Sequence, residues 1–494
     1  MWLTQLLERN RQCRPGRTAL VDEERSVTWA ELHDRTVELA RGLAESGIRP
    51  GDRVAVLSKD RVEVLETYFA LARLGALFVP LNHSLAEPEV AGIVERVGAV
   101  AVIGESDLLD RHLDLADSVR IRLALDKPAF ATLGSLATER DLPVVADTDP
   151  IAVLHTSATT GQAKGVTVDS ASFRAIALGW LVMARPTDDI VMVNCCPLYH
   201  GSMVVSLTYM AAGATIVLMP GFTPQRALAA VERHRATHMW MVPQMLRFML
   251  QAKASAHTDL SSLREVLYGA APMPLDVYAE AVERLGCGFR QVYGMTEVGG
   301  PFVTLGPDEH PAPGDVTARI PCGRVVPGMS ARAVDGTGRE LPPGDIGEIV
   351  VRGPGVMQGY WNDPEATREI TLDGWIRTGD LGFLDEEGRI SLVDRTKDVI
   401  IRAGQNVYPS EIERALMTHP AVRDAAVVGM PDEDYGEVPL AYVVTEPGTE
   451  PGAAALLAHV AGLLAPYKRP RRVEFIEQVP RNPAGKIIKK LLRV

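Results

Sequence analysis

Short apolar runs alternate with helical patterns along most of the first 300 residues, and this alternation constrains the fold more than any other feature. Val54–Leu57 precedes a helical pattern over Val62–Leu74, and Leu77–Leu81 precedes another over Glu87–Val97. Further strand-like runs lie at Ile190–Cys195, Ala214–Met219, Thr237–Val242, Val266–Tyr268 and Gly288–Val292, with helical segments between them. Repeated β–α units of this kind predict an α/β fold, with mainly parallel sheets covered by helices.

Near the N-terminus, apolar residues recur at helical spacing from Thr28 to Gly47. Thr28 and Glu31 have the spacing of a capping box, and Gly47 ends the pattern. The sixteen residues MWLTQLLERNRQCRPG carry scattered charges and no apolar h-region, so no secretory signal is expected. No run of the chain approaches the length of a membrane span. We therefore expect a soluble, cytoplasmic protein without a membrane partner.

The pattern of apolar residues and turns changes after about residue 320. Short β-like segments such as Ala331–Asp335 and Glu348–Arg352 are separated by Gly/Pro turns, and a helix is expected over Ser410–Leu416. A chain of 494 residues is also too long for one hydrophobic core. We predict a large N-terminal domain over 1–394, with a β-rich, mainly antiparallel subdomain at about 320–394. A small α+β domain would follow over 395–494.

Charge and cysteine content exclude several classes of function. The net charge of −12 argues against nucleic acid as the main partner, because phosphate contacts need a basic surface. The five cysteines show no C-x-x-C spacing and no accompanying histidine cluster, so free thiols are expected rather than disulfides or a zinc site.

The segment His155–Val166, HTSATTGQAKGV, follows an apolar run at Ile151–Leu154 that is typical of a buried strand. It concentrates small hydroxyl residues and glycine before one lysine: Thr156, Ser157, Thr159, Thr160, Gly161 and then Lys164. Oriented N–H groups, hydroxyls and one cation suit the phosphates of a nucleotide. It is not a Walker A loop, which needs an earlier glycine and a hydroxyl after the lysine. The alternative interpretation is a Ser/Thr-rich turn between a strand and a helix.

Several later motifs are also rich in glycine, hydroxyls and charge. They are GAAPMP (Gly269–Pro274), YGMTEVGG (Tyr293–Gly300), GWIRTGDLG (Gly374–Gly382), DRTKDVIIRAGQNVYPSEIE (Asp394–Glu413) and PRNPAGKI (Pro480–Ile487). Each one alone is also compatible with an ordinary surface turn. Together and in this order, they resemble the AMP-forming adenylating family, which comprises acyl-CoA and aryl-CoA synthetases, adenylation domains of peptide synthetases and firefly-type luciferases. The resemblance extends from about residue 20 to the end of the chain.

The resemblance implies an enzyme that joins a carboxylic acid to ATP, releases pyrophosphate and passes the acyl group to a thiol. It implies that Thr156, Ser157, Thr159, Thr160, Gly161 and Lys164 hold the β- and γ-phosphates. Thr296 would contact the α-phosphate, and Glu297 would help to hold Mg²⁺, a cation that prefers oxygen ligands. The adenine would be framed by Gly269, Ala270, Ala271, Tyr293 and Gly294. Asp380 would accept hydrogen bonds from the ribose, with Arg395 assisting.

The family fold also implies a mobile C-terminal domain. Lys486 would reach the α-phosphate and the attacking carboxylate; the alternative is a solvated tail lysine beside Lys489 and Lys490. A hinge is expected near Lys397, about which the small domain would rotate to bring the loop around Gly404 toward the site. Alternatively, Lys397 is an exposed charge in a linker.

The phosphate loop departs from the family pattern S-G-T-T-G-x-P-K-G at two positions. Ala158 replaces a glycine, and Ala163 replaces a proline. A Cβ at residue 158 restricts φ and would crowd a phosphate if the family glycine has a positive φ. The groups that contact phosphate are retained, so we expect a working but slower adenylation site.

The segment CCPLYHG (Cys195–Gly201) matches the P-L-[FY]-H motif of the family, in which His200 would line the acid pocket. It lacks the aspartate that anchors the amine in amino-acid-activating relatives, so an α-amino acid is not expected as substrate. Candidate pocket walls are Tyr199, Met203, Tyr209, Trp240, Met241 and Gly300, although such residues suit a protein core equally well. Bulky walls favour an aryl or medium-length acid over a long fatty chain.

The leading hypothesis is an AMP-forming acid:CoA ligase that uses ATP, Mg²⁺ and CoA. A second hypothesis keeps the adenylation but changes the acceptor to a carrier-protein thiol, or to nitrite for N–N bond formation in specialised metabolism. A third is a non-catalytic nucleotide-binding protein, against which the presence of Glu297, Asp380 and Lys486 argues. The identity of the acid and the oligomeric state are left open, with a homodimer among the arrangements considered.

Overall fold

The computed structural model describes residues 1–112, 115–135, 137, 141–156, 163–199, 201–315, 319–481 and 487–492. These residues form two compact units. The first unit contains the described residues up to Ser330 together with Arg352–Ile370, and the second contains Ala331–Val351 and the described residues from Thr371 onward. The predicted domain boundary at residue 394 and the predicted hinge stay predictions.

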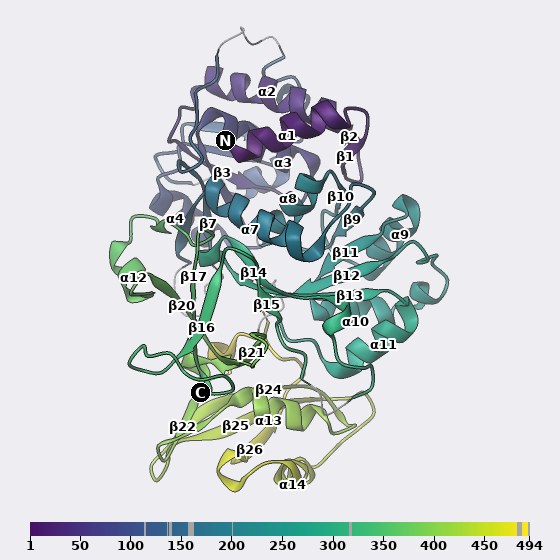
Figure 1. Ribbon diagram of the computed structural model, residues 1–494, viewed down its shortest axis with the longest axis vertical. Coiled ribbons are helices and arrows are strands. Elements are labelled where there is room, and N and C mark those ends of the chain that lie inside the picture. The colour runs from purple at the N-terminus through teal and green to yellow at the C-terminus, as the bar shows by residue number, and fades with distance from the viewer. Residues whose placement is uncertain are drawn as a thin grey trace. The chain divides into compact units, whose positions relative to one another are not determined.

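A nine-stranded sheet forms one half of the first unit (Figure 1), in the order β15-β14-β13-β12-β11-β9-β10-β1-β2. Its strands are β1 (Thr18–Val21), β2 (Ser26–Thr28), β9 (Val191–Asn194), β10 (Thr215–Leu218), β11 (His238–Met241), β12 (Glu265–Gly269), β13 (Gly288–Met295), β14 (Gly300–Leu305) and β15 (Arg324–Val325). Neighbours from β13 to β1 in this order are parallel, whereas the pairs at both edges are antiparallel.

A seven-stranded sheet forms the other half of this unit, in the order β18-β8-β7-β4-β3-β5-β6. Its strands are β3 (Arg53–Leu57), β4 (Leu77–Leu81), β5 (Ala101–Gly104), β6 (Ile121–Ala124), β7 (Pro150–His155), β8 (Gly165–Asp169) and β18 (Gly359–Tyr360). The neighbours from β7 to β6 are parallel, and β8 is antiparallel to both β7 and β18. The prediction of mainly parallel, helix-covered sheets is therefore confirmed.

Helices of the first unit begin and end where the local sequence provides caps. They are α1 (Trp2–Cys13), α2 (Trp29–Glu45), α3 (Val62–Leu74), α4 (Glu87–Val97), α5 (Ser106–Arg111), α6 (Pro128–Ala131), α7 (Ser170–Ala184), α8 (Ser202–Ala212), α9 (Pro224–His234), α10 (Pro243–Gln251), α11 (Leu275–Leu285) and α12 (Pro364–Glu369). The predicted capping box starts α2: Thr28 Oγ1 accepts the N–H of Glu31, and the Glu31 carboxylate accepts the N–H of Thr28. Gly75 (φ +74°) and Gly98 (φ +61°) end α3 and α4 in the left-handed conformation.

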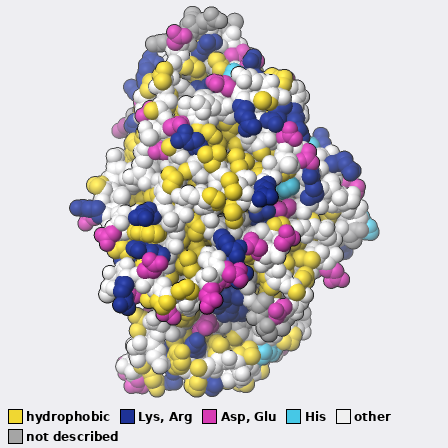
Figure 2. Space-filling model, in the orientation of Figure 1, with side chains coloured by type: hydrophobic (Ala, Val, Ile, Leu, Met, Phe, Trp, Pro, Cys, Tyr) yellow, Lys and Arg dark blue, Asp and Glu magenta, His cyan; other side chains and the backbone are white. Residues whose placement is uncertain are grey.

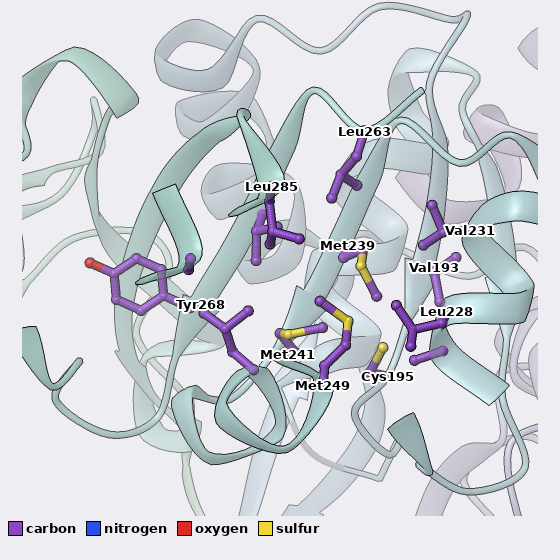
Figure 3. Close-up of a cluster of buried hydrophobic side chains, with 14 of the residues drawn as sticks. Val193, Cys195, Leu228, Val231, Met239, Met241, Met249, Leu263, Tyr268 and Leu285 are labelled. Carbon is purple, nitrogen blue, oxygen red and sulfur yellow. The ribbon is translucent and has the colours of Figure 1, made fainter. Parts of the chain in front are cut away.

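The nine-stranded sheet has different helices on its two faces. On one face, α9, α10 and α11 enclose a core that contains Val193, Met239 and Met241 from the strands (Figure 3). On the other face, α7 and α8 pack against each other and against β14. Because side chains alternate along a strand, Asn194 and Trp240 point to the face that α8 covers. Met241 is thus a core residue, which excludes the pocket-wall interpretation for this position.

The second unit contains two further sheets. One holds β16 (Ser330–Val334), β17 (Gly347–Arg352), β19 (Thr371–Leu372), β20 (Trp375–Leu384) and β21 (Ile390–Arg395); the other holds β22 (Ile400–Arg402), β23 (Gln405–Val407), β24 (Val422–Asp432), β25 (Gly436–Thr445) and β26 (Arg472–Phe475). In the first of these sheets, β20 is antiparallel to β17, β19 and β21. Helices α13 (Pro409–Met417) and α14 (Ala453–Leu463) complete the core of the second. The predicted β-rich segment and the α+β segment are both present.

Lysine and arginine side chains are interspersed with aspartate and glutamate on the face shown in Figure 2, rather than gathered into a basic block. Within the part of the chain that the structure describes, no helix combines the length and the apolar character needed to cross a bilayer.

Candidate active site

The predicted phosphate loop connects two antiparallel strands, β7 and β8. Their register pairs Leu154 with Val166 and His155 with Gly165. Thr156 N–H donates to the carbonyl of Lys164 (3.0 Å), and Lys164 N–H donates to Thr156 Oγ1 (3.2 Å). The segment is therefore a hairpin, and the interpretation as a turn between a strand and a helix is wrong. The long-range pairing of β8 with β7 and β18 decides this, and local composition does not reveal it.

Ser157, Thr159, Thr160 and Gly161 lie outside the described residues. Ala158 lies there as well, so the expected effect of its Cβ stays a prediction. At the base of the hairpin, Trp361 N–H donates to the Gly165 carbonyl (2.7 Å), which ties the residue after β18 to the first residue of β8.

Lys164 lies beside Tyr360, a residue that the motif analysis did not single out. The Lys164 ammonium is 5.0 Å from the centre of the Tyr360 ring and 4.0 Å from Oε2 of Glu369. The hydroxyl of the same tyrosine donates to Glu297 Oε1 (2.8 Å). Tyr360 reaches this position because β18 pairs with β8, matching Tyr360 with Val166. The lysine predicted for the phosphates and the carboxylate predicted for the metal thus interact with the same tyrosine, the lysine with its ring and the carboxylate with its hydroxyl.

The environment of Tyr360 keeps its hydroxyl protonated. Burial raises the pKa of Tyr360, and the negative charge of Glu297 raises it further. The phenol therefore acts as a hydrogen-bond donor that orients the carboxylate. Glu297 itself lies in a single 3₁₀ turn, Thr296–Val298, directly after β13, and its carbonyl accepts the N–H of Met357 (2.9 Å).

The motif GAAPMP begins at the last residue of β12, where backbone from two strands lies close together. A Cβ on Gly269 would be 2.4 Å from the carbonyl oxygen of Val292 and 3.3 Å from the Trp240 ring. Ala270 has φ +66°, a conformation that is uncommon for a residue other than glycine and often marks functional sites. Ala271 follows it in the same turn. The backbone of Ala270 and Ala271 lies at the carboxyl ends of parallel strands, where α/β sheets bind ligands.

The YGMTE motif continues this strand-end cluster from β13. A Cβ on Gly294 would be 2.3 Å from the carbonyl oxygen of Gly300, so only glycine fits there. The Tyr293 ring packs against Phe302, with ring centres 5.2 Å apart. The structure therefore brings the predicted adenine residues of β12 and β13 together, since the register pairs Gly269 with Val292, next to Tyr293.

In the second unit, Asp380 and Arg395 are brought together as predicted. They are directly opposite each other on β20 and β21, and Arg395 Nε lies 3.3 Å from Asp380 Oδ1. Asp380 is only 9% exposed, and its N–H donates to Thr378 Oγ1 (3.1 Å). Lys397 follows in a 3₁₀ turn, Thr396–Asp398, immediately after β21.

The segment that carries Lys486 is anchored at both ends, although residues 482–486 lie outside the described residues. Arg481 pairs with Ile487 in an isolated β-bridge and donates to both carboxylate oxygens of Asp424 (2.9 Å each). Lys489 Nζ lies 2.9 Å from Glu413. Burial alone would lower the pKa of Lys489, but the carboxylate of Glu413 raises it. Lys489 is therefore a largely buried ion-pair residue. Lys486 itself lies outside the described residues, so both its catalytic role and the alternative of a solvated tail lysine stay predictions.

His200 also lies outside the described residues, but the segment before it shows a group that the sequence analysis missed. Leu198 N–H donates to Oδ1 of Asp60 (2.9 Å), a fully buried carboxyl beside a cavity of about 10 Å³. Burial raises the pKa of Asp60 to about 8. Asp60 therefore holds the CCPLYHG segment in place as a neutral acid. Nothing in the surrounding letters, SKDRVE, distinguishes this aspartate from a surface charge.

Comparison with known proteins shows the family of the chain. Residues 7–361 match the family described as AMP-binding enzyme, and residues 411–486 match the AMP-binding enzyme C-terminal domain. The chain belongs to the AMP-binding enzyme family, which confirms the predicted AMP-forming adenylating enzyme.

The similarity covers nearly the whole chain. It is 36% identical to a fatty acid–[acyl-carrier-protein] ligase, ScoC, of Streptomyces coeruleorubidus, over 99% of this chain and 96% of that protein. It is 37% identical to a feruloyl-CoA synthase of an Amycolatopsis species, over 96% and 95%. The crystal structure of ATP-bound MatB from Rhodopseudomonas palustris superposes with a TM-score of 0.91 at 32% identity, over 99% of this chain and 98% of that one.

Proposed function

We propose that this chain joins a carboxylic acid to ATP, releasing pyrophosphate, and then transfers the acyl group of the adenylate to the thiol of CoA. The observation that carries the proposal is the arrangement of Lys164, Tyr360 and Glu297. A triphosphate with its divalent cation needs a positive group for phosphate oxygens and a carboxylate for the metal, held in fixed positions. Two opposite charges held by the same half-buried tyrosine, one over its ring and one at its hydroxyl, meet this need.

Mg²⁺ fits this site as a cation held mainly by the substrate. The described residues contain no group of three His, Cys, Asp or Glu side chains that would form a protein cage for a metal. Mg²⁺ is commonly bound through one or two carboxylates together with substrate phosphates. Glu297 would supply the carboxylate, and the bound ion would neutralise charge on the phosphates.

The remaining roles follow the family resemblance. Phosphate binding is assigned to Thr156, Ser157, Thr159, Thr160, Gly161, Lys164 and Thr296, and adenine binding to Gly269, Ala270, Ala271, Tyr293 and Gly294. In the second unit, Asp380 and Arg395 are assigned to the ribose. Lys486 would neutralise the α-phosphate and the attacking carboxylate, because two anions must otherwise meet. Lys397 keeps its proposed role as the pivot, and His200 its proposed place in the acid pocket.

We further propose that the acid is aryl or of medium length and is not an α-amino acid. Trp240 supports this proposal, because its bulky ring lies 3.3 Å from the position that a Cβ on Gly269 would occupy and so limits the space beside the turn assigned to the nucleotide. The relative named feruloyl-CoA synthase supports an aryl acid, whereas the relative named fatty acid–[acyl-carrier-protein] ligase favours a carrier-protein thiol as the second candidate acceptor. A cytoplasmic location and a homodimer remain part of the proposal, and light scattering of the purified protein tests the homodimer.

A panel of carboxylic acids, scored by pyrophosphate release, tests the first half-reaction. Parallel reactions with CoA, a phosphopantetheinylated carrier protein or nitrite then identify the acceptor by its product. The proposal fails if no acid releases pyrophosphate, and the CoA assignment fails if only another acceptor yields product.

Lys486→Ala tests the assigned chemistry directly. It should abolish adenylate formation while thioester formation from a supplied acyl-adenylate continues, because the second half-reaction does not bring two anions together. Lys490→Ala is the matched control and should leave both half-reactions unchanged. Normal adenylation by Lys486→Ala would show that the role is assigned to the wrong residue.

A further inference from the structure

Three buried polar groups on one face of the nine-stranded sheet have no hydrogen-bond partner among the described residues. They are Asn194 Nδ2, Trp240 Nε1 and Ser206 Oγ. Asn194 and Ser206 are completely buried, and Trp240 is 5% exposed. Buried donors are nearly always paired, and leaving one unpaired is destabilising, so an unpaired set needs an explanation.

These three groups come from neighbouring elements. Asn194 and Trp240 are direct partners in the register of β9 and β11, so their side chains share a face. Helix α8 covers this face, because the Tyr209 ring lies 5.7 Å from the His238 ring. Ser206 precedes Tyr209 by three residues on the same side of the helix, and Trp240 follows His238 by two residues on the same side of the strand.

Each of the three groups can donate a hydrogen bond. Asn194 Oδ1 accepts the N–H of Cys196 (3.2 Å), which turns the Nδ2 donor group away from that contact. The indole Nε1 of Trp240 can only donate, and the hydroxyl of Ser206 can also donate. The matching ligand group is therefore an acceptor oxygen.

This set adjoins both parts of the proposed acid site. Asn194 directly precedes the CCPLYHG segment, and the Trp240 ring lies 3.3 Å from the position that a Cβ on Gly269 would occupy. Gly269 belongs to the turn assigned to the nucleotide. An acyl group attached to that nucleotide would extend over the face that carries Trp240 and Asn194.

We propose that the acid substrate carries an acceptor oxygen away from its carboxylate, as a hydroxyl, ether or oxo group, and that Asn194, Trp240 and Ser206 bind this oxygen. The inference rests on the proposed function and narrows its substrate class. The three side chains then determine specificity, and an acid with a purely hydrocarbon tail is a poor substrate because it leaves the donors unpaired.

Matched pairs of acids test the inference in the wild-type protein. Suitable pairs are 4-methoxycinnamic with 4-ethylcinnamic acid and 6-oxoheptanoic with heptanoic acid, scored by pyrophosphate release. In at least one pair, kcat/KM should favour the oxygen-containing acid by about 10- to 100-fold, which is the cost of leaving a buried donor unpaired. Equal kcat/KM values in every pair would overturn the inference while leaving the proposed function intact. If no acid reacts, the proposed function fails and this inference fails with it.

Two conservative variants then assign the effect to residues. Trp240→Phe and Ser206→Ala should each reduce the preference for the oxygen-containing acid by about three- to tenfold, with little change for its hydrocarbon partner. The matched control is Trp29→Phe, because Trp29 is also a buried tryptophan with an unpaired Nε1 but lies in α2. It should leave the preference unchanged. If Ser206→Ala and Trp240→Phe slow both acids of a pair equally, the side chains have only a structural role and the inference is overturned.

Discussion

Replacing Asp60 with asparagine should stabilise the protein more and more as the pH rises from 5 to 8. Asp60 is buried, and burial raises the pKa of its carboxyl from 3.8 to about 8. In the unfolded chain the same carboxyl titrates near its ordinary value. Between these two pKa values the folded protein holds a proton that the unfolded chain has released, so raising the pH favours unfolding.

The magnitude follows from the difference in proton binding. Each pH unit between the two pKa values costs the folded state about 1.4 kcal/mol, so the folded protein loses about 4 kcal/mol from pH 5 to pH 8 through this one group. Asparagine has the shape of the neutral acid and keeps the oxygen that accepts the N–H of Leu198. The variant Asp60→Asn should therefore avoid this loss, and its advantage over the wild type should level off above about pH 8.

Urea or thermal unfolding of the wild type and of Asp60→Asn across this pH range provides the measurement. Asp126→Asn serves as a control whose stability difference from the wild type should stay constant between pH 5 and pH 8 and change only at lower pH. Burial alone would raise the pKa of Asp126, but hydrogen bonds from Ser106 outweigh it and lower the pKa. The stability that Asp126 contributes is present above its unfolded pKa and is lost as the pH falls. A stability difference between Asp60→Asn and the wild type that does not change with pH would refute the reasoning.

Three further variants test the site and its support. Gly269→Ala should reduce the rate of adenylation by at least about tenfold, because the new Cβ would lie 2.4 Å from a carbonyl oxygen of the neighbouring strand. Gly16→Ala is the control, because Gly16 has open space around it. This control should retain the wild-type rate of pyrophosphate release. Tyr360→Phe removes the hydrogen bond to Glu297 while keeping the ring, so the Mg²⁺ concentration needed for half-maximal rate should rise; an unchanged Mg²⁺ dependence would contradict the role of Tyr360. Glu413→Gln leaves a buried lysine without its carboxylate and should cost about 3 kcal/mol in the free energy of unfolding, measured in urea; a loss below about 1 kcal/mol would contradict the ion-pair assignment.

Local sequence patterns were sufficient to predict many helices and strands. The predicted bounds Val62–Leu74, Leu77–Leu81 and Glu87–Val97 coincide with α3, β4 and α4. The reason is that each of these two helices ends at a glycine in the left-handed conformation, Gly75 or Gly98, and a buried apolar run marks the strand between them. Caps and periodicity act over a few residues, so they can be recognised without knowledge of the tertiary fold.

The features that the sequence analysis missed depend on residues far apart in the chain. Tyr360 became part of the site only because β18 pairs with β8, about 190 positions earlier in the sequence, and Asp60 acts on Leu198 across 138 positions. Neither residue belongs to a motif whose spacing suggests chemistry. Both nevertheless act on motif residues: Tyr360 orients Glu297, and Asp60 fixes the segment that leads to His200. The motifs thus identified the groups assigned to the nucleotide and the acid, whereas the groups that orient them emerged only from the paired strands. Variants of Asp60 and Tyr360 therefore test what the fold adds to the motifs, since these residues can change while every motif stays intact.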